Sequence, residues 1–342
     1  MSVDLGALSG LADRVHTGEL RNLHAVLVVQ HGEPVFEAHF SGPDQNIVDL
    51  VTGKSGASAY TPGALHDVRS VTKSVTSLLY GIALADGAVP SPDAPVIESF
   101  PDYADLRTAE RKRLLVRHLL TMTMGVEWDE SISYLDPRNS EIQMVRSDDP
   151  YRFVLSRPVV APPGERFTYS GGATELVGKL ISDGTRRQID AYARDVLFEP
   201  LGITDFMWAR APHGRPMCAS GLRLRAPDLA KIAQLYLTGG VHGGRVVAPD
   251  TWLSESLRPH VTHGAGAYGF FFWLSGRGRV AAAMGNGGQR AAVIPERDVV
   301  VVILAGNYDD FGPSVTDRVM REHVLPAVGL PPDESPAPFL AP

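Results

Sequence analysis

The sequence predicts an α+β fold in which both ends of the chain contribute to one antiparallel sheet and the middle forms a helical insertion. Two observations predict the sheet: a hairpin pattern near the N-terminus, and four short apolar runs near the C-terminus that are close enough in sequence to pair antiparallel. The third observation is the stretch between them, which alternates short helical patterns with loops rich in Pro, Asp and Arg. We therefore expect an α/β lobe of residues 1–85 and 216–342 and a mainly helical lobe of residues 86–215.

The N-terminal elements follow from the spacing of apolar residues. Residues 4–17 predict a short amphipathic helix. Leu23–Gln30 and Val35–Phe40 flank a His-Gly-Glu-Pro turn, which is typical of a β-hairpin. The stretch 41–64 is polar and rich in glycine, so we expect a loop there.

The later elements follow from the same reasoning. Three segments carry apolar residues at helical spacing, namely Val71–Leu84, Ala173–Ile181 and Ala226–Leu237. Four apolar runs bounded by Gly, Pro, Asn or charged residues predict strands at Tyr268–Leu274, Val280–Met284, Arg290–Ile294 and Val299–Leu304. A last helix is expected over residues 313–325, and the Pro-rich tail after residue 331 is expected to be loose.

The composition argues against several classes of function. The 342 residues carry 32 basic and 39 acidic side chains, and the net charge of −7 argues against a nucleic-acid partner. The single cysteine, Cys218, allows neither an internal disulfide nor a cysteine metal cluster. No run approaches the roughly 18 apolar residues of a membrane span, and the first residues lack the features of a secretory signal. We expect a cytoplasmic protein with no membrane contact. The sequence does not decide between a monomer and a homodimer.

Two short motifs resemble cofactor or metal sites, but the residues around them do not fit such sites. Residues 264–269 match the Gly-x-Gly-x-x-Gly dinucleotide fingerprint, but a predicted strand follows them and none precedes them. His260 and His263 are three residues apart, but Pro259 and Gly264 bracket them, so scattered histidines are favoured over metal ligands. We therefore expect neither a cofactor nor a metal.

A serine and a lysine stand one helical turn apart at the start of the helix predicted from Val71. Ser70 alone would be interpreted as an N-cap residue. Lys73 shares its face of the helix and is followed by apolar side chains. Desolvation there is expected to lower the pKa of the Lys73 ammonium and to give a neutral amine that accepts the serine proton. The pair indicates a serine nucleophile.

Two further segments carry residues suited to acyl chemistry. Tyr169 stands just before a predicted helix, where it is either a core residue or, beside a protonated lysine, a shuttle for the leaving-group proton. Asn286, Gly287 and Gly288 lie between two predicted strands. They either mark a tight hairpin or let a substrate approach the backbone closely, as an oxyanion site requires.

These three pieces, in this order, resemble the serine β-lactamase and penicillin-binding protein superfamily. Ser70-x-x-Lys73 matches its nucleophile motif, Tyr169-Ser170-Gly171 stands where class C enzymes and related esterases carry Tyr-x-Asn, and Asn286-Gly287-Gly288 stands where they carry Lys-Thr-Gly. The resemblance covers roughly residues 20–325 and includes two further runs, Arg117–Gly125 and Pro249–Trp252. It implies a β-lactamase/transpeptidase-like fold with a serine nucleophile.

Two departures shift the expected substrate. Gly171 replaces the asparagine that orients a β-lactam amide in class C enzymes, and Asn286 replaces the lysine that binds the carboxylate of such a drug. The motif pattern is more similar to aminohexanoate-oligomer (nylon dimer) hydrolases and to β-lactamase-fold carboxylesterases, as is the run Trp128-Asp129-Glu130. We therefore expect a hydrolase that acts on a small-molecule ester or amide.

The resemblance also implies a mechanism. Ser70 attacks the carbonyl and forms an acyl-enzyme, with Lys73 or Tyr169 as the proton acceptor, and the sequence leaves the choice between these two open. The backbone N–H groups of Ser70 and Gln289 hold the oxyanion. Tyr169 then helps to protonate the leaving group, and the same pair activates water.

Substrate contacts are expected from two places. Residues 128–149 predict a lid over the nucleophile, with Trp128 and Tyr134 binding substrate, although a merely solvated surface loop fits the same residues. The other contacts are expected along the two motifs described above, at Gly171, Asn286, Gly287 and Gly288.

Two other functions fit the same residues. An acyltransferase would use the same acyl-enzyme but pass it to an alcohol or amine. A non-catalytic, acylable binding or sensor protein belongs to a different class, and the intact Ser70, Lys73 and Tyr169 argue against it.

Overall fold

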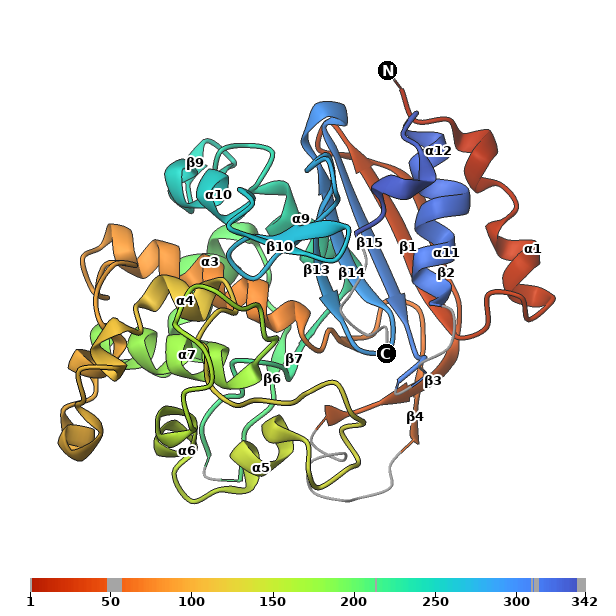
Figure 1. Cartoon of the computed structure of the whole chain (residues 1–342). Helices are drawn as coiled ribbons and strands as arrows, with labels where there is room; N and C mark the ends of the chain where they lie inside the picture. Colours follow the sequence, from red (N-terminus) through yellow and green to blue (C-terminus); the bar gives the residue numbers. More distant parts are fainter. Residues whose placement is uncertain (1, 48–56, 213, 309, 311–313, 337–342) are drawn as a thin grey trace.

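One antiparallel sheet joins the two ends of the chain in the computed structural model, which describes residues 2–47, 57–212, 214–308, 310 and 314–336 (Figure 1). Its strands are β1 (Leu23–Gln30), β2 (Glu33–His39), β10 (Val261–His263), β11 (Gly266–Tyr268), β12 (Trp273–Leu274), β13 (Ala281–Gly285), β14 (Gln289–Ile294) and β15 (Val299–Ala305). Their order is β10-β11-β12-β13-β14-β15-β1-β2. The N-terminal β1 therefore pairs with the C-terminal β15, which confirms the predicted sheet.

Helices cover both faces of this sheet. They are α1 (Leu11–His16), α3 (Val71–Ala85), α4 (Val116–Leu120), α5 (Ser140–Arg146), α6 (Pro150–Ser156), α7 (Gly171–Thr185), α8 (Ile189–Ala193), α9 (Ala226–Gln234), α10 (Asp250–Ser256), α11 (Val315–Val319) and α12 (Leu325–Ala327). Figure 1 shows α1, α11 and α12 on one side of the sheet and the remaining helices on the other. Within the described ranges, no helix combines the length and the apolar character that crossing a bilayer requires.

The sheet separates two hydrophobic cores. Along β15, Val300, Val302 and Leu304 belong to the core shared with α3, α7 and α9, whereas Val301 and Ile303 belong to the core under α11 and α12. A strand turns successive side chains to opposite faces, so an unbroken apolar run fits a strand that is covered on both sides. The first core draws residues from both predicted lobes, and the division of the chain into two lobes stays a prediction.

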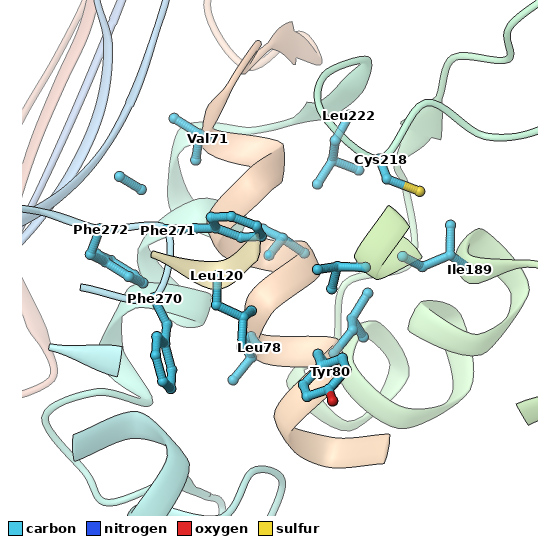
Figure 2. Packing of buried hydrophobic residues seen from close by; sticks show 14 of the residues in the cluster. Val71, Leu78, Tyr80, Leu120, Ile189, Cys218, Leu222, Phe270, Phe271 and Phe272 are labelled. Atoms are coloured by element: carbon cyan, nitrogen blue, oxygen red, sulfur yellow. The ribbon is translucent and has the colours of Figure 1, made fainter. Parts of the chain in front are cut away.

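The helix that begins at Ser70 runs through the first core. Every residue of α3 from Val71 to Ala83 is buried, and Figure 2 shows its side chains between the phenylalanines at 270–272 on one side and Cys218 and Leu222 on another. This is the helix predicted for Val71–Leu84. Its complete burial is what removes Lys73 from water.

Smaller pieces of sheet surround the main one. These are β3 (Gly42–Gln45) with β4 (Ala57–Tyr60), β5 (His66–Asp67) with β7 (Leu222–Leu224) and β6 (Met207–Trp208), and β8 (Val241–His242) with β9 (Arg245–Val246). The expectation of a loop over residues 41–64 is therefore wrong in part, because β3 and β4 pair with each other. Residues 48–56 of that stretch lie outside the described residues.

The predicted strand over Tyr268–Leu274 is wrong as one element. It is two short strands, β11 and β12, that pair antiparallel, with Tyr268 opposite Trp273. Between them the chain folds back at Phe271, which adopts φ +61°. All three phenylalanines are buried, and a regular strand would send adjacent side chains to opposite faces.

The C-terminal expectations also need correction. The last helix, predicted over residues 313–325, is an unbroken helical run from Val315 to Ala327, but its middle at Met320–Val324 is π-helical and joins α11 to α12, and residue 313 lies outside the described residues. The tail after residue 331 is not loose as far as it is described: Glu334 is 1% exposed and accepts a hydrogen bond from the hydroxyl of Ser275 (2.6 Å). Near the N-terminus, the predicted helix over residues 4–17 is split into a 3₁₀ turn at Leu5–Leu8 and α1.

Candidate active site

Ser70 stands at the N-terminus of α3, directly after a backbone turn that a side chain holds in place. Arg69 adopts φ +49°, which is unusual for a residue with a side chain. Asp67 supports this turn, because its carboxylate accepts hydrogen bonds from the backbone N–H groups of Arg69 (2.9 Å) and Ile47 (2.9 Å). Ser70 occupies the N-cap position, but its hydroxyl makes no capping hydrogen bond. A capping role therefore does not account for this serine.

The three predicted catalytic side chains meet at this helix start. Lys73 Nζ donates hydrogen bonds to Ser70 Oγ (3.1 Å) and to the carbonyl of Ala219 (2.9 Å). The Tyr169 hydroxyl is hydrogen-bonded to both Lys73 and Ser70. Lys73 is only 1% exposed, so these contacts replace the water that its ammonium has lost.

Tyr169 is positioned by the start of α7 and by neighbouring aromatic rings. The next residue, Ser170, caps α7 with its hydroxyl. The Tyr169 ring stacks on Trp273 with centroids 5.6 Å apart, and Phe167 meets Tyr268 and Trp273 edge to face. We call Phe167, Tyr169, Tyr268 and Trp273 the aromatic wall. The sequence analysis missed it, although the dense aromatic run before residue 274 was a signal.

The surroundings of Lys73 act on its pKa in two opposite directions. Burial lowers the pKa, as the sequence predicts, but the electrostatic interactions with Tyr169, Glu141 and Glu130 and the hydrogen bond with Tyr169 raise it and outweigh burial. The expectation of a neutral Lys73 amine is therefore wrong. The pKa stands above its ordinary value, and Lys73 is an ammonium at neutral pH.

Tyr169 carries its proton at neutral pH. Burial raises the pKa of the Tyr169 hydroxyl, and the charge of Lys73 and the hydrogen bond with Ser70 lower that pKa only in part. Tyr169 is thus a neutral phenol next to a cation that stabilises its phenolate. Lys73 and Tyr169 both contact Ser70. The positive charge of Lys73 favours the loss of the proton from the Tyr169 phenol.

Three carboxyl groups act on Lys73, those of the buried Glu130 and Glu141 and the half-buried Glu175, and the sequence analysis missed this role for them. Burial, together with the charge of Glu141, raises the pKa of Glu130 to about 8, and burial raises the pKa of Glu175 to about 7. Glu175 also accepts a hydrogen bond (2.9 Å) from the backbone N–H of Ala219, whose carbonyl binds Lys73. No spacing in the sequence predicts this group, because only the fold brings its members together.

The predicted lid, residues 128–149, is packed in part against the site. Trp128 is 8% exposed, and its indole N–H donates a hydrogen bond to Glu130 (2.6 Å). Tyr134 is half-buried and packs against the first core. A merely solvated loop therefore does not describe this stretch. Substrate contacts by Trp128 and Tyr134 stay predictions.

Gly171 gives space to the protein's own carboxyl groups. A Cβ atom at this position would lie 2.8 Å from the carboxyl carbon of Glu141 and 3.1 Å from Glu130 Oε1. The backbone N–H of Gly171 donates a hydrogen bond to Glu130. Two carboxyl groups thus occupy the space that a side chain at position 171 would fill. A larger residue does not fit here for that reason.

The turn between β13 and β14 lies beside Ser70. A Cβ atom at Gly285 would lie 3.1 Å from the backbone nitrogen of Ser70, so the end of β13 runs directly against it. Gly285 opens the glycine-containing run at 285–289 for which the sequence predicted either a tight hairpin or a close approach to the backbone. Gln289, the other predicted oxyanion donor, is 1% exposed, and its side-chain amide donates a hydrogen bond to the carbonyl of Ala305 (2.6 Å). That bond fixes the turn, and the use of its backbone N–H stays a prediction.

The two glycines of this turn have a clear structural reason. Gly287 (φ +87°) and Gly288 (φ +95°) both adopt the left-handed backbone that favours glycine. Added Cβ atoms would approach Tyr308 at 2.5 Å and Thr316 at 2.9 Å, respectively. Substrate contacts by these glycines and by Asn286 stay predictions.

The comparison with known families identifies the family to which this fold belongs. The profile of the β-lactamase family matches residues 21–324. The chain belongs to the β-lactamase family. Members of this family share a fold of helices around an antiparallel sheet, and the chain is thus a β-lactamase-fold member of a family of serine hydrolases.

Individual proteins are similar to the chain to different extents. The 6-aminohexanoate-dimer hydrolase of Paenarthrobacter ureafaciens is 25% identical over 285 residues, which cover 72% of this chain and 68% of the relative. Monacolin J acid methylbutanoyltransferase of Aspergillus terreus is 32% identical over 117 residues, which cover 32% of this chain and only 27% of that protein. A solved structure described as a hydrolase with promiscuous acyltransferase activity superposes with a TM-score of 0.68 at 14% identity, covering 91% of this chain and 96% of its own. The predicted fold class and family resemblance are confirmed.

Proposed function

We propose that the protein is a serine hydrolase that forms an acyl-enzyme on Ser70 and hydrolyses a carboxylic ester or a small amide. The observation that carries this proposal is the contact of Ser70 Oγ with both Lys73 and Tyr169 at the start of α3. A serine hydroxyl in contact with a titratable group that can accept its proton, next to a cation that stabilises the resulting base, is the arrangement of an activated nucleophile. The similarity to a 6-aminohexanoate-dimer hydrolase over most of the chain supports it.

The charges in the site favour Tyr169 over Lys73 as the base. In this proposal Ser70 Oγ attacks the carbonyl carbon while its proton passes to the Tyr169 phenolate, which the Lys73 ammonium stabilises. The backbone N–H groups of Ser70 and Gln289 bind the oxyanion. Tyr169 then returns the proton to the leaving group, and water, deprotonated in the same way, releases the acyl group.

The site supports an ester or small amide better than a β-lactam. The position of Gly171, where a β-lactam-orienting side chain would be expected, borders the carboxyl groups of Glu130 and Glu141. Asn286 provides no positive charge for a drug carboxylate. Of the aromatic wall, Phe167 is half-buried and offers apolar surface for the acyl or alcohol part of a substrate, whereas the buried Tyr268 and Trp273 support it from behind.

Rapid mixing with a short-chain p-nitrophenyl ester tests the proposal. We expect a burst of p-nitrophenol close to one equivalent, continued turnover, and a mass increase of one acyl group that maps to Ser70. Ser70→Ala should lose both the burst and the adduct. Equal rates for Ser70→Ala and wild type would contradict the nucleophile assignment, and an adduct that never turns over would favour a sensor.

An acyltransferase is the second candidate, because two comparisons favour it. One relative is named a methylbutanoyltransferase, and one structural neighbour is described as having promiscuous acyltransferase activity. Adding a series of small alcohols to the ester assay separates the two functions. A hydrolase releases mainly free acid, whereas an acyltransferase releases mainly the new ester at alcohol concentrations far below that of water.

A further inference from the structure

Two glutamate side chains, Glu130 and Glu141, meet beside Gly171 and act electrostatically on Lys73. Glu130 and Glu141 are 6% and 5% exposed. A carbon atom built on Gly171 would lie 3.1 Å from Glu130 Oε1 and 2.9 Å from Glu141 Oε2, so both carboxyl groups face the same small space. Such proximity of two buried carboxyl groups requires that something compensates their charge.

The two oxygens of Glu130 differ in their partners. Oε1 accepts hydrogen bonds from the indole N–H of Trp128 (2.6 Å) and from the backbone N–H of Gly171. Oε2 is buried, and it has no hydrogen-bond partner among the residues that the structure describes. A bare carboxylate oxygen in a buried site costs several kcal/mol. A proton on one of the two carboxyl groups removes that cost and the repulsion between them.

The other titratable groups around the pair come from four elements. Lys73 of α3 is the cation that attracts it, and Tyr169, ahead of α7, faces both carboxyl groups. Glu175 of α7 lies within range of Glu141, and Tyr268 of β11 within range of Glu130. The charge of Lys73 thus faces the carboxyl groups of Glu130, Glu141 and Glu175. The net charge of this group approaches zero only when some of these carboxyl groups keep their protons.

We propose that Glu130 and Glu141 hold one proton between them, and that their single remaining negative charge fixes Lys73 as an ammonium and leaves Tyr169 as the base for Ser70. This proposal rests on the proposed function. Glu130 and Glu141 touch neither Ser70 nor the reacting atoms, so they are positioning residues that act through Lys73 and Tyr169. The space left by Gly171 is what allows the pair to form.

The proton balance of acylation is simple in this arrangement. Ser70 loses its hydroxyl proton to the Tyr169 phenolate as the bond from Oγ to the carbonyl carbon forms. When the bond to the leaving group breaks, Tyr169 gives that proton to the departing oxygen or nitrogen. Lys73 keeps its three protons and the carboxyl pair keeps its one throughout.

Carbon-13 NMR of protein labelled at the glutamate carboxyl carbons tests the shared proton without any need for activity. Glu130→Gln and Glu141→Gln identify the two signals. In the wild type we expect one of them to ionise near pH 8, where burial and Glu141 place the pKa of Glu130. In Glu141→Gln the carboxyl of Glu130 should ionise at least one pH unit lower than in the wild type, because its like-charged neighbour is gone.

The control is Glu127→Gln, in the same segment, whose side chain is 57% exposed. It should leave both titrations unchanged. A wild-type protein in which both carboxyl groups are ionised at pH 6 overturns the proposal, even if neither variant folds. An unmoved titration of Glu130 in folded Glu141→Gln overturns it as well.

Kinetics provide the second readout. Glu130 and Glu141 raise the pKa of both Lys73 and Tyr169, so Glu141→Gln should shift the rising limb of kcat/KM for p-nitrophenyl acetate to lower pH by about one unit. A merely structural role would lower the rate without moving the limb, and that result contradicts the proposal. If Ser70→Ala hydrolyses the ester as fast as wild type, the proposed function fails while the NMR result still decides the shared proton.

Discussion

In the proposed mechanism Lys73 provides a positive charge and Tyr169 accepts the proton of Ser70. Lys73 keeps its ammonium because Tyr169, Glu141 and Glu130 together outweigh its burial. The pKa of Tyr169 lies above that of a free tyrosine, first because of burial. If the phenolate takes the Ser70 proton, only the ionised fraction of Tyr169 is active, and that fraction increases with pH.

Activity should therefore rise steeply with pH through the neutral range. We expect kcat/KM for a p-nitrophenyl ester to increase about tenfold per pH unit until Tyr169 ionises. Tyr169→Phe should lower kcat/KM by about 10²–10⁴-fold and flatten the profile. The measurement is a pH series of initial rates for both proteins. A steep limb that persists in Tyr169→Phe would assign the base to another group.

The raised pKa of Glu130 predicts how the free energy of unfolding depends on pH. Its pKa in the folded protein, about 8, lies above the ordinary 4.5, so the folded state binds this proton more tightly than the unfolded chain does. The resulting stabilisation is complete below pH 4.5 and is lost as pH rises to about 8, at up to about 1.4 kcal/mol per pH unit. Glu130→Gln should remove this loss, so that its free energy of unfolding gains on wild type as pH rises. Urea unfolding at several pH values checks this, with Glu127→Gln as the control, and parallel curves would refute it.

The meeting of the proposed catalytic residues was predictable, but their protonation was not. Ser70 and Lys73 are one helical turn apart, so local geometry alone brings them together. The near neighbours of Lys73 in sequence are apolar, and they suggested a lowered pKa. The charges that reverse this effect lie on Glu130 and Glu141, far along the chain, and only tertiary structure brings them to Lys73.

The helix that carries the nucleophile depends on a close contact with α10. Gly81 of α3 leaves room for the indole of Trp252, whose N–H donates a hydrogen bond to the carbonyl of Ser77 (2.9 Å). A Cβ atom at Gly81 would lie 2.1 Å from Trp252 Cδ1. A helix interior normally favours alanine over glycine. Here the packing overrides that preference.

Gly81→Ala should therefore destabilise the protein. Overpacking costs about 1–3 kcal/mol, and the clash with Trp252 should outweigh the gain of about 1 kcal/mol from helix propensity. The matched control is Gly10→Ala, where an added Cβ would meet no atom within 4 Å. Its effect should stay below about 1 kcal/mol. Thermal unfolding of both variants checks this, and a stabilised Gly81→Ala would contradict the packing argument.

The elements divide into those that local pattern specifies and those that tertiary packing specifies. The helix from Val71 and the strands β1, β13, β14 and β15 have strong apolar patterns, and each was predicted close to its observed place. The run Tyr268–Leu274 has an equally apolar pattern, yet it folds back because three adjacent phenylalanines all fill one core. No rule of alternation predicts that fold-back, since it depends on which face of the sheet has space.

Across the whole molecule, the position of β1 governs how the fold can form. The sheet is complete only when β1, from the start of the chain, inserts between β2 and β15. The unbroken apolar runs of β1 and β15 are typical of strands that are covered on both faces. The burial of Glu334 and its hydrogen bond with Ser275 could not be predicted from any local pattern. A sheet built from distant strands must close a long loop before contacts compensate for it.

Refolding should accordingly be slow. From urea, we expect the protein to regain native tryptophan fluorescence over about a second or longer rather than within milliseconds. Stopped-flow dilution measures this. Recovery of ester hydrolysis should not precede the slow phase, because Gly285 at the end of β13 borders Ser70. A millisecond recovery of activity would contradict the role given to the β1–β15 pairing.

The pairing of β1 with β15 has a further consequence for the protein while it is being made. A ribosome must extend the chain from Gln30 to Val299 before β15 exists, which takes on the order of tens of seconds at about 5–20 residues per second. During that time β1, an apolar strand, has only β2 as a partner. Nascent chains of this protein should therefore be clients of the chaperones that bind exposed apolar strands, and truncated products that end before β15 should be degraded rather than accumulate.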